Sequence, residues 1–240
     1  VDTHGGFEGT GSPAFAGSRT YRDGTYLVPY GQEVVAYPAA PGGWPDRMPA
    51  SGERRMRWST LRNGSTAGEH PGWWSQGVAR PIPVDGVVVY GSGQEEESHV
   101  SAVDVDDGSR IWKQTVGDPY EKPYRIRRST TVVEPDHGTV VSSLRWGIDY
   151  EGGLVAHRLD DGTHRWTTTL GDAHDVLAVD DGTAYVSLKD GSEAKVVTLC
   201  AVALDDGTLR WRQRIRDSVR YGIAVDDDHC YHLGGTGTDG

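Results

Sequence analysis

Three stretches of the chain align without gaps: VSAVDVDDGSRIW at residues 100–112, LVAHRLDDGTHRW at 154–166 and LCAVALDDGTLRW at 199–211. Each has an alanine at its third position, Asp-Asp-Gly at its seventh to ninth, and a tryptophan four residues after the glycine. These shared residues are Ala102, Ala156 and Ala201, then Gly108, Gly162 and Gly207, then Trp112, Trp166 and Trp211. A weaker upstream copy ends at Trp58, so the tryptophans are spaced by 54, 54 and 45 residues. Self-similarity at such a period indicates a repeat architecture.

A second signal recurs with the same period. Asp-Gly followed by alternating apolar residues occurs at residues 23–28, 85–90 and 181–186, and an Asp-His-Gly variant occurs at 136–141. A degenerate copy lies at residues 227–231. Asp-Gly between alternating runs favours a tight hairpin, because glycine accepts the positive φ that the turn needs. One period therefore predicts strand, Asp-Gly turn, strand, variable loop, strand, Asp-Asp-Gly turn and tryptophan-bearing strand, which is a four-stranded antiparallel meander.

Such a small sheet cannot bury both of its faces alone. Radial stacking of four-stranded sheets solves this problem, and the result is a β-propeller. We expect an all-β domain over residues 1–240, with each tryptophan packed between neighbouring blades. The expected blades span residues 11–60, 79–116, 129–170 and 175–215, with a partial blade at 221–240, so about four and a half blades form a partial ring. A β-sandwich or a β-helix remains the alternative.

The composition excludes several classes of function. With 35 acidic and 24 basic residues the net charge is −11, which disfavours nucleic-acid and anionic-membrane binding. No stretch is apolar enough for a transmembrane segment. The chain begins at Val1 without an export signal. The acidic excess leaves a salt-loving source open, and the two cysteines, Cys200 and Cys230, leave a single disulfide open.

The repeat resembles the PQQ-type (pyrroloquinoline quinone-like) propeller pattern, Ala-x-Asp-x-x-Thr-Gly-x-x-x-Trp. Residues 102–112 match at Ala, Asp, Gly and Trp, with Asp107 in place of the threonine. The two later copies keep Ala, Gly and Trp but have Arg158 and Ala203 at the Asp position. The resemblance covers nearly the whole chain. It implies exported proteins with rings of seven or eight blades, which include quinone-dependent dehydrogenases and BamB-type scaffolds of outer-membrane assembly.

The resemblance implies two competing functions. The preferred one is a non-catalytic, extracytoplasmic scaffold that binds another protein through its loops, with no cofactor. The alternative is a fragment of a PQQ-dependent dehydrogenase, in which calcium is held by Glu, Asn and Asp near an adjacent cysteine pair. This chain has one asparagine, Asn63, and its cysteines are not adjacent. No position carries over from the enzymes, so no catalytic residue is predicted.

Several local patterns have a functional and a structural interpretation. Trp73 and Trp74, in a proline-containing insertion, are the best candidates for a partner-binding rim, and they leave carbohydrate binding as a third function. Asn63 begins a glycosylation pattern or a turn. The sequence His229-Cys230-x-His232 splits its side chains between two faces of a strand, so no metal site is predicted. Residues 104–108 resemble a calcium loop but fit the recurring turn better, and the arginines at 210, 212, 214 and 216 line an outer strand or an anion-binding face.

Overall fold

The computed structural model describes residues 20–22, 25–30, 33–38, 58–59, 81–93, 98–116, 124–146, 151–171, 173–189, 197–215, 223–225 and 229–232. Asn63, Trp73 and Trp74 lie outside these ranges. Within them, no helix is long and apolar enough to cross a membrane.

The described strands form five antiparallel sheets, four of them with four strands in meander order. Blade one contains β1 (Thr20–Arg22), β2 (Thr25–Tyr30), β3 (Glu33–Pro38) and β4 (Trp58–Ser59). Blade two contains β5 (Ile82–Val84), β6 (Val87–Gly93), β7 (Ser98–Asp104) and β8 (Arg110–Val116). Blade three contains β9 (Tyr124–Glu134), β10 (Thr139–Trp146), β11 (Glu151–Arg158) and β12 (His164–Thr169). Blade four contains β13 (Ala173–Asp180), β14 (Thr183–Lys189), β15 (Val197–Ala203) and β16 (Leu209–Ile215), and β17 (Ile223–Val225) pairs with β18 (Cys230–His232) in a fifth sheet.

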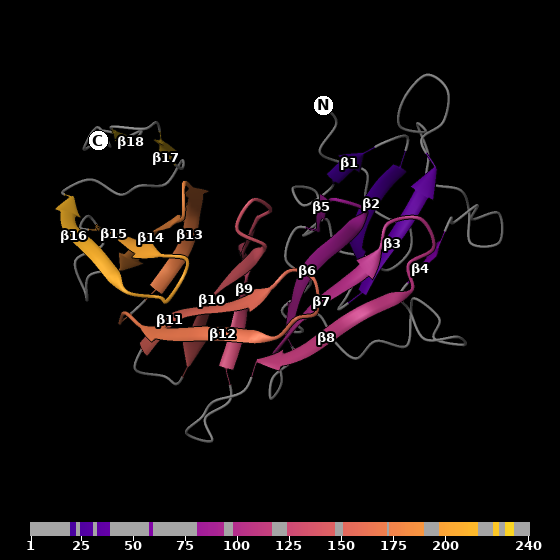
Figure 1. Ribbon diagram of the computed structural model, residues 1–240, viewed down its shortest axis with the longest axis horizontal. Coiled ribbons are helices and arrows are strands. Elements are labelled where there is room, and N and C mark those ends of the chain that lie inside the picture. The colour runs from indigo at the N-terminus through magenta and orange to yellow at the C-terminus, as the bar shows by residue number, and fades with distance from the viewer. Residues whose placement is uncertain are drawn as a thin grey trace, which may run out of the picture.

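The sheets follow one another in chain order around an open arc (Figure 1). Three clusters of buried apolar side chains hold the arc together, and each draws its members from two successive blades. Leu27 and Val88 share one cluster, and Val100 and Val140 share the next. This arrangement confirms the prediction of an all-β propeller that forms a partial ring.

Each complete blade places an alanine opposite its tryptophan. The Cα pairs between the third and fourth strands are Ala36–Trp58, Ala102–Trp112, Ala156–Trp166 and Ala201–Trp211. Directly opposed residues point to the same face of a sheet, so the small alanine leaves room for the indole. A register shift follows the alanine in blades two to four, where the third strand leads into the Asp-Asp-Gly turn. The shared alanine and tryptophan thus occupy equivalent register positions in all four blades.

Two of the tryptophans fill the seam to the following blade. Trp112 donates from Nε1 to the Leu159 carbonyl at 2.8 Å, and Trp166 makes the same bond to Leu204 at 2.7 Å. Each indole lies against the turn glycine of the next blade: a Cβ added to Gly162 would lie 2.7 Å from the Trp112 ring. Both indoles are buried. The seam therefore requires glycine for contact as well as for its positive φ of 73°.

The predicted packing between blades is not observed for the other two tryptophans. Trp211 is 39% exposed, and its ring contacts Tyr185 at a centroid distance of 6.1 Å. The side chain of Trp58 lies outside the described residues, although its backbone pairs with Ala36. The equivalent seam contact is thus observed for Trp112 and Trp166.

Gly162→Ala should destabilise the protein more than Gly86→Ala does. Both glycines have positive φ, 73° and 80°, but a Cβ at Gly86 would meet no described atom within 4 Å. Backbone strain alone costs about 1–2 kcal/mol, and overpacking against Trp112 adds about 1–3 kcal/mol. Urea unfolding of both variants tests this expectation. Equal losses of unfolding free energy would mean that the indole contact contributes little.

His157 is a buried histidine in β11 that makes stability depend on pH. Its side chain is 3% exposed, and its Nδ1 has no hydrogen-bond partner among the described residues. Its ring lies edge-on to that of His164 at 6.0 Å. Burial, and secondarily the charge of His164, lower the pKa of His157 from 6.5 to about 4. The folded protein therefore keeps His157 neutral at pH values where the unfolded chain is already protonated.

Stability should fall as the pH drops from about 6.5 to about 4. Over this window the unfolded state binds the proton that folded His157 rejects, a difference of roughly 3 kcal/mol. His157→Gln should flatten this part of the profile of unfolding free energy against pH. His164→Gln serves as the control and should retain most of the slope, because burial is the larger cause of the shift. A wild-type profile that is flat between pH 4 and 6.5 would refute the assignment.

Candidate functional site at the rim between two blades

The two turns of each meander meet at one end of the blade. The residue before Asp-Asp-Gly donates its backbone N–H to the glycine carbonyl of the first turn. This bond recurs as Val105 to Gly86 at 2.9 Å, Leu159 to Gly138 at 2.8 Å and Leu204 to Gly182 at 2.9 Å. Because it repeats from blade two to blade four, each of these blades presents two turns tied to each other, and together these turns form the rim.

The carboxylates of the Asp-Asp-Gly turns largely serve the turns themselves. Asp107 accepts the backbone N–H of Ser109 at 2.7 Å, and this bond lowers the pKa of Asp107. The equivalent bonds run from Thr163 to Asp161 and from Thr208 to Asp206, both at 2.8 Å. Asp104 accepts the N–H of Asp106 at 2.7 Å. Residues 104–108 therefore use their carboxylates as turn caps, which agrees with the turn interpretation rather than the calcium-loop one.

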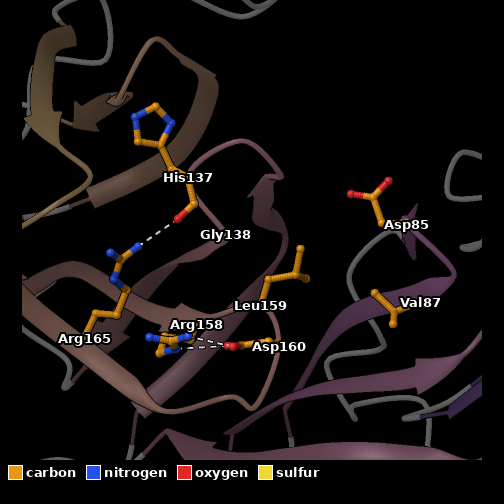
Figure 2. A pocket seen from close by; sticks show the side chains of 8 residues that line it. All are labelled: Asp85, Val87, His137, Gly138, Arg158, Leu159, Asp160 and Arg165. Atoms are coloured by element: carbon orange, nitrogen blue, oxygen red, sulfur yellow. Dashed lines mark hydrogen bonds and ion pairs between the residues drawn. The ribbon is translucent and has the colours of Figure 1, made fainter.

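A pocket of about 380 Å³ opens at this rim between blades two and three (Figure 2). The first turn of blade two and both turns of blade three supply its walls. Its lining comprises Asp85, Val87, His137, Gly138, Arg158, Leu159, Asp160 and Arg165. The volume falls in the range of small-ligand pockets, and the lining combines charged groups with apolar side chains.

Arg158 and Asp160 form a paired charge within the lining. Arg158 donates from Nε to Asp160 Oδ1 at 3.0 Å and from Nη2 to Oδ2 at 2.6 Å. Asp161 lies 3.8 Å from Arg158 Nε. The hydrogen bonds raise the pKa of Arg158 and lower the pKa of Asp160. This two-point contact holds both side chains in place, while their exposure limits its contribution to stability.

Arg165 approaches the pocket from β12 without a carboxylate partner among the described residues. Its Nη1 donates to the His137 carbonyl at 3.1 Å (Figure 2). The same Nη1 also donates to Thr139 Oγ1. Arg210 donates in the same way to Thr183 Oγ1 in blade four. A bond to two neutral acceptors fixes the direction of the guanidinium and leaves other N–H donors for a ligand.

The sequence-predicted residues frame the pocket but do not line it. Trp112 bonds the carbonyl of Leu159, a lining residue, and packs on Gly162 beneath the adjacent turn.

Cys200 is a free, buried thiol, so no disulfide with Cys230 is formed, and burial raises the pKa of Cys200. The rings of His229 and Tyr231 lie 5.7 Å apart on one side of the fifth sheet. In the described part of the chain no three His, Cys, Asp or Glu residues are grouped to hold a metal.

None of the pocket residues was predicted as a site. Two sequence signals point to it in hindsight. Arg158 replaces the repeat's aspartate, and the first turn of blade three, which contains His137, is two residues longer than the Asp-Gly turns of blades two and four. The described lining residues include no serine, cysteine or lysine. Their charged and polar groups can recognise a ligand by charge and hydrogen bonding.

Comparison with solved structures supports the propeller fold. A europium-containing methanol dehydrogenase matches with 14% identity over 90% of this chain and 44% of that chain, with a TM-score of 0.53. The Dos1 propeller matches with 7% identity over 80% and 45%, with a TM-score of 0.51. A quinohemoprotein alcohol dehydrogenase from Pseudomonas putida HK5 matches with 16% identity over 81% and 33%, with a TM-score of 0.47. This chain thus spans less than half of each of these structures, and the two matches with TM-scores above 0.5 show likeness of the fold alone.

Sequence comparison identifies the family. No curated protein matches the chain. The family model described as outer membrane protein assembly factor BamB matches residues 8–174 and again residues 150–238. These ranges together cover nearly the whole chain and contain every blade described above. The chain belongs to this BamB-like family of PQQ-type β-propellers.

Proposed function

We propose that this chain is a non-catalytic propeller scaffold that binds another protein outside the cytoplasm. The observation that carries the proposal is the family match, which runs from residue 8 to residue 238 under the description of an outer membrane assembly factor. An assembly factor acts by holding other proteins, and an outer-membrane role implies export. One fold can host many activities, so membership of a family does not by itself establish a function. The geometry of the rim gives independent support for the scaffold function.

The rim has the physical properties of a binding surface. Its turns are tied to each other and, through Trp112, to the preceding blade, so their geometry is fixed before a partner arrives. Rigid presentation lowers the ordering entropy that binding costs. Loops at the end of a rigid scaffold are also where binding residues concentrate. The charges of the pocket add the polar contacts that give an interface its specificity.

A quinone-dependent dehydrogenase fits the residues of this chain poorly. Cys200 is buried inside blade four and has no adjacent cysteine, so the cysteine pair of those enzymes has no counterpart. The sole asparagine, Asn63, lies between blades one and two in the sequence. We therefore derive no step that uses quinone or calcium.

Photo-crosslinking tests the scaffold function. A photoreactive residue in place of Asp136, exposed on the rim, should yield a discrete crosslinked protein with envelope extract from the source organism. The same residue in place of Thr169, at the opposite end of β12, is the matched control and should yield much less. Equal crosslinking at both positions, or none at either, would contradict a partner at the rim.

Quinone titration tests the enzymatic alternative. With added PQQ and calcium, the purified chain should give no cofactor absorbance band after gel filtration and no alcohol-dependent dye reduction. A stoichiometric bound quinone with dye reduction would replace the scaffold function by a dehydrogenase.

A further inference from the structure

The pocket between blades two and three exists because the first turns of successive blades differ in length. Blade three has the four-residue turn Pro135-Asp136-His137-Gly138, whereas in blades two and four Asp-Gly alone joins the two strands. At the seam between blades three and four, a Cβ on Gly182 would lie 3.0 Å from His137 Nε2, so the imidazole fills that space. At the seam between blades two and three, a Cβ on the equivalent Gly138 would meet no described atom within 4 Å. The short turn of blade two therefore leaves open the space that His137 fills one seam further on.

Two charges of the pocket have no described partner of opposite sign. Arg165 donates only to neutral oxygens, those of His137 and Thr139. Asp85 is exposed at a turn position with a φ of 42°, and it makes no hydrogen bond or ion pair with a described residue. The remaining pair, Arg158 and Asp160, neutralises itself. Among its described residues, the pocket thus offers one anion-binding group, Arg165, and one cation-binding group, Asp85, that have no described partner of opposite sign.

These two groups lie on opposite walls. Figure 2 shows Asp85 at one side of the pocket and Arg165 at the other, with Leu159 between them and Val87 beside Asp85. The complementary ligand carries a negative and a positive group separated by a small apolar spacer. In a protein, such a ligand is a short segment with an acidic side chain, one or more small residues and a basic side chain.

We propose that this pocket binds a peptide segment of the partner protein, with an acidic side chain on Arg165 and a basic side chain on Asp85. The inference rests on the proposed function and names the chemistry of the partner. The guanidinium offers a carboxylate directional, charge-assisted hydrogen bonds, and it is already held in position by His137 and Thr139. Leu159 and Val87 contact the spacer, and the volume of about 380 Å³ admits only a few residues.

Nuclear magnetic resonance with synthetic peptides tests the proposal. The probes are acetylated, amidated peptides with one Glu and one Lys separated by one to four alanines, in both orders. The indole N–H of Trp112 reports on the pocket because it bonds to Leu159, and the indole N–H of Trp166 reports on the next seam through Leu204. At least one peptide should shift the Trp112 signal in a saturable way and leave Trp166 in place. Peptides with only Glu or only Lys should bind at least about tenfold more weakly.

The repeat provides matched control variants. Arg165→Gln and Asp85→Asn should each weaken binding about 10- to 100-fold, because each removes a charge-assisted contact. Arg210→Gln loses the equivalent bond to Thr183, and Asp181→Asn changes the equivalent turn residue, with a φ of 36°; neither lines the pocket. Both controls should bind like the wild type. Asn tolerates positive φ, so Asp85→Asn preserves the turn even if Arg165→Gln proves unstable.

The outcomes separate this inference from the scaffold function. Failure of every peptide to shift Trp112, equal affinity for singly charged peptides, or unchanged binding by both pocket variants would overturn the inference. If crosslinking from position 136 still succeeds in that case, the scaffold function stands and only the assignment of the pocket fails. If crosslinking fails as well, both are wrong.

Discussion

The contact between the indole of one blade and the turn glycine of the next determines the rest of the structure. Trp112 inserts over Gly162 and donates to Leu159, so a single side chain joins two sheets by packing and by a hydrogen bond. Leu159 in turn donates its N–H to Gly138. The same residue therefore links its own two turns and the preceding blade. Trp166 and Leu204 repeat this arrangement one blade later, which makes the rim as regular as the seams beneath it.

Because the rim is regular, small sequence differences between blades change the shape and charge of single places along it. The turn that contains His137 is two residues longer than its counterparts, and the result is a filled seam on one side and an open pocket on the other. Arg158 takes the place of the repeat's aspartate, and it binds Asp160 instead of capping the turn. Blade two has Val87 and Ile111 where blades three and four have a hydrogen-bonded threonine and arginine. Blades three and four therefore each hold a guanidinium fixed at the rim, and blade two has an isoleucine at that position.

The features that the sequence predicted are those that recur. The alanine, the turn glycine and the tryptophan obey constraints imposed within one blade or between neighbours, so each copy of the repeat reveals them. The pocket is different, because its walls come from one turn in blade two and two turns in blade three. It also depends on the short turn of blade two, which carries no counterpart of His137 to fill the space. Asp85 and Arg165 are separated by 80 positions in the sequence, and no local pattern relates them.

The net charge of the chain bears on which partner reaches the rim. At −11 the long-range field attracts basic segments and repels acidic ones. An acidic side chain is attracted to this surface only at short range. There it meets an oriented guanidinium that has no carboxylate partner among the described residues. Arg165 provides such a group within a rim that also includes the acidic residues Asp85, Asp136 and Asp160. The field thus favours the encounter with a basic segment, and the pocket discriminates among basic segments by the acidic residue that accompanies the positive charge.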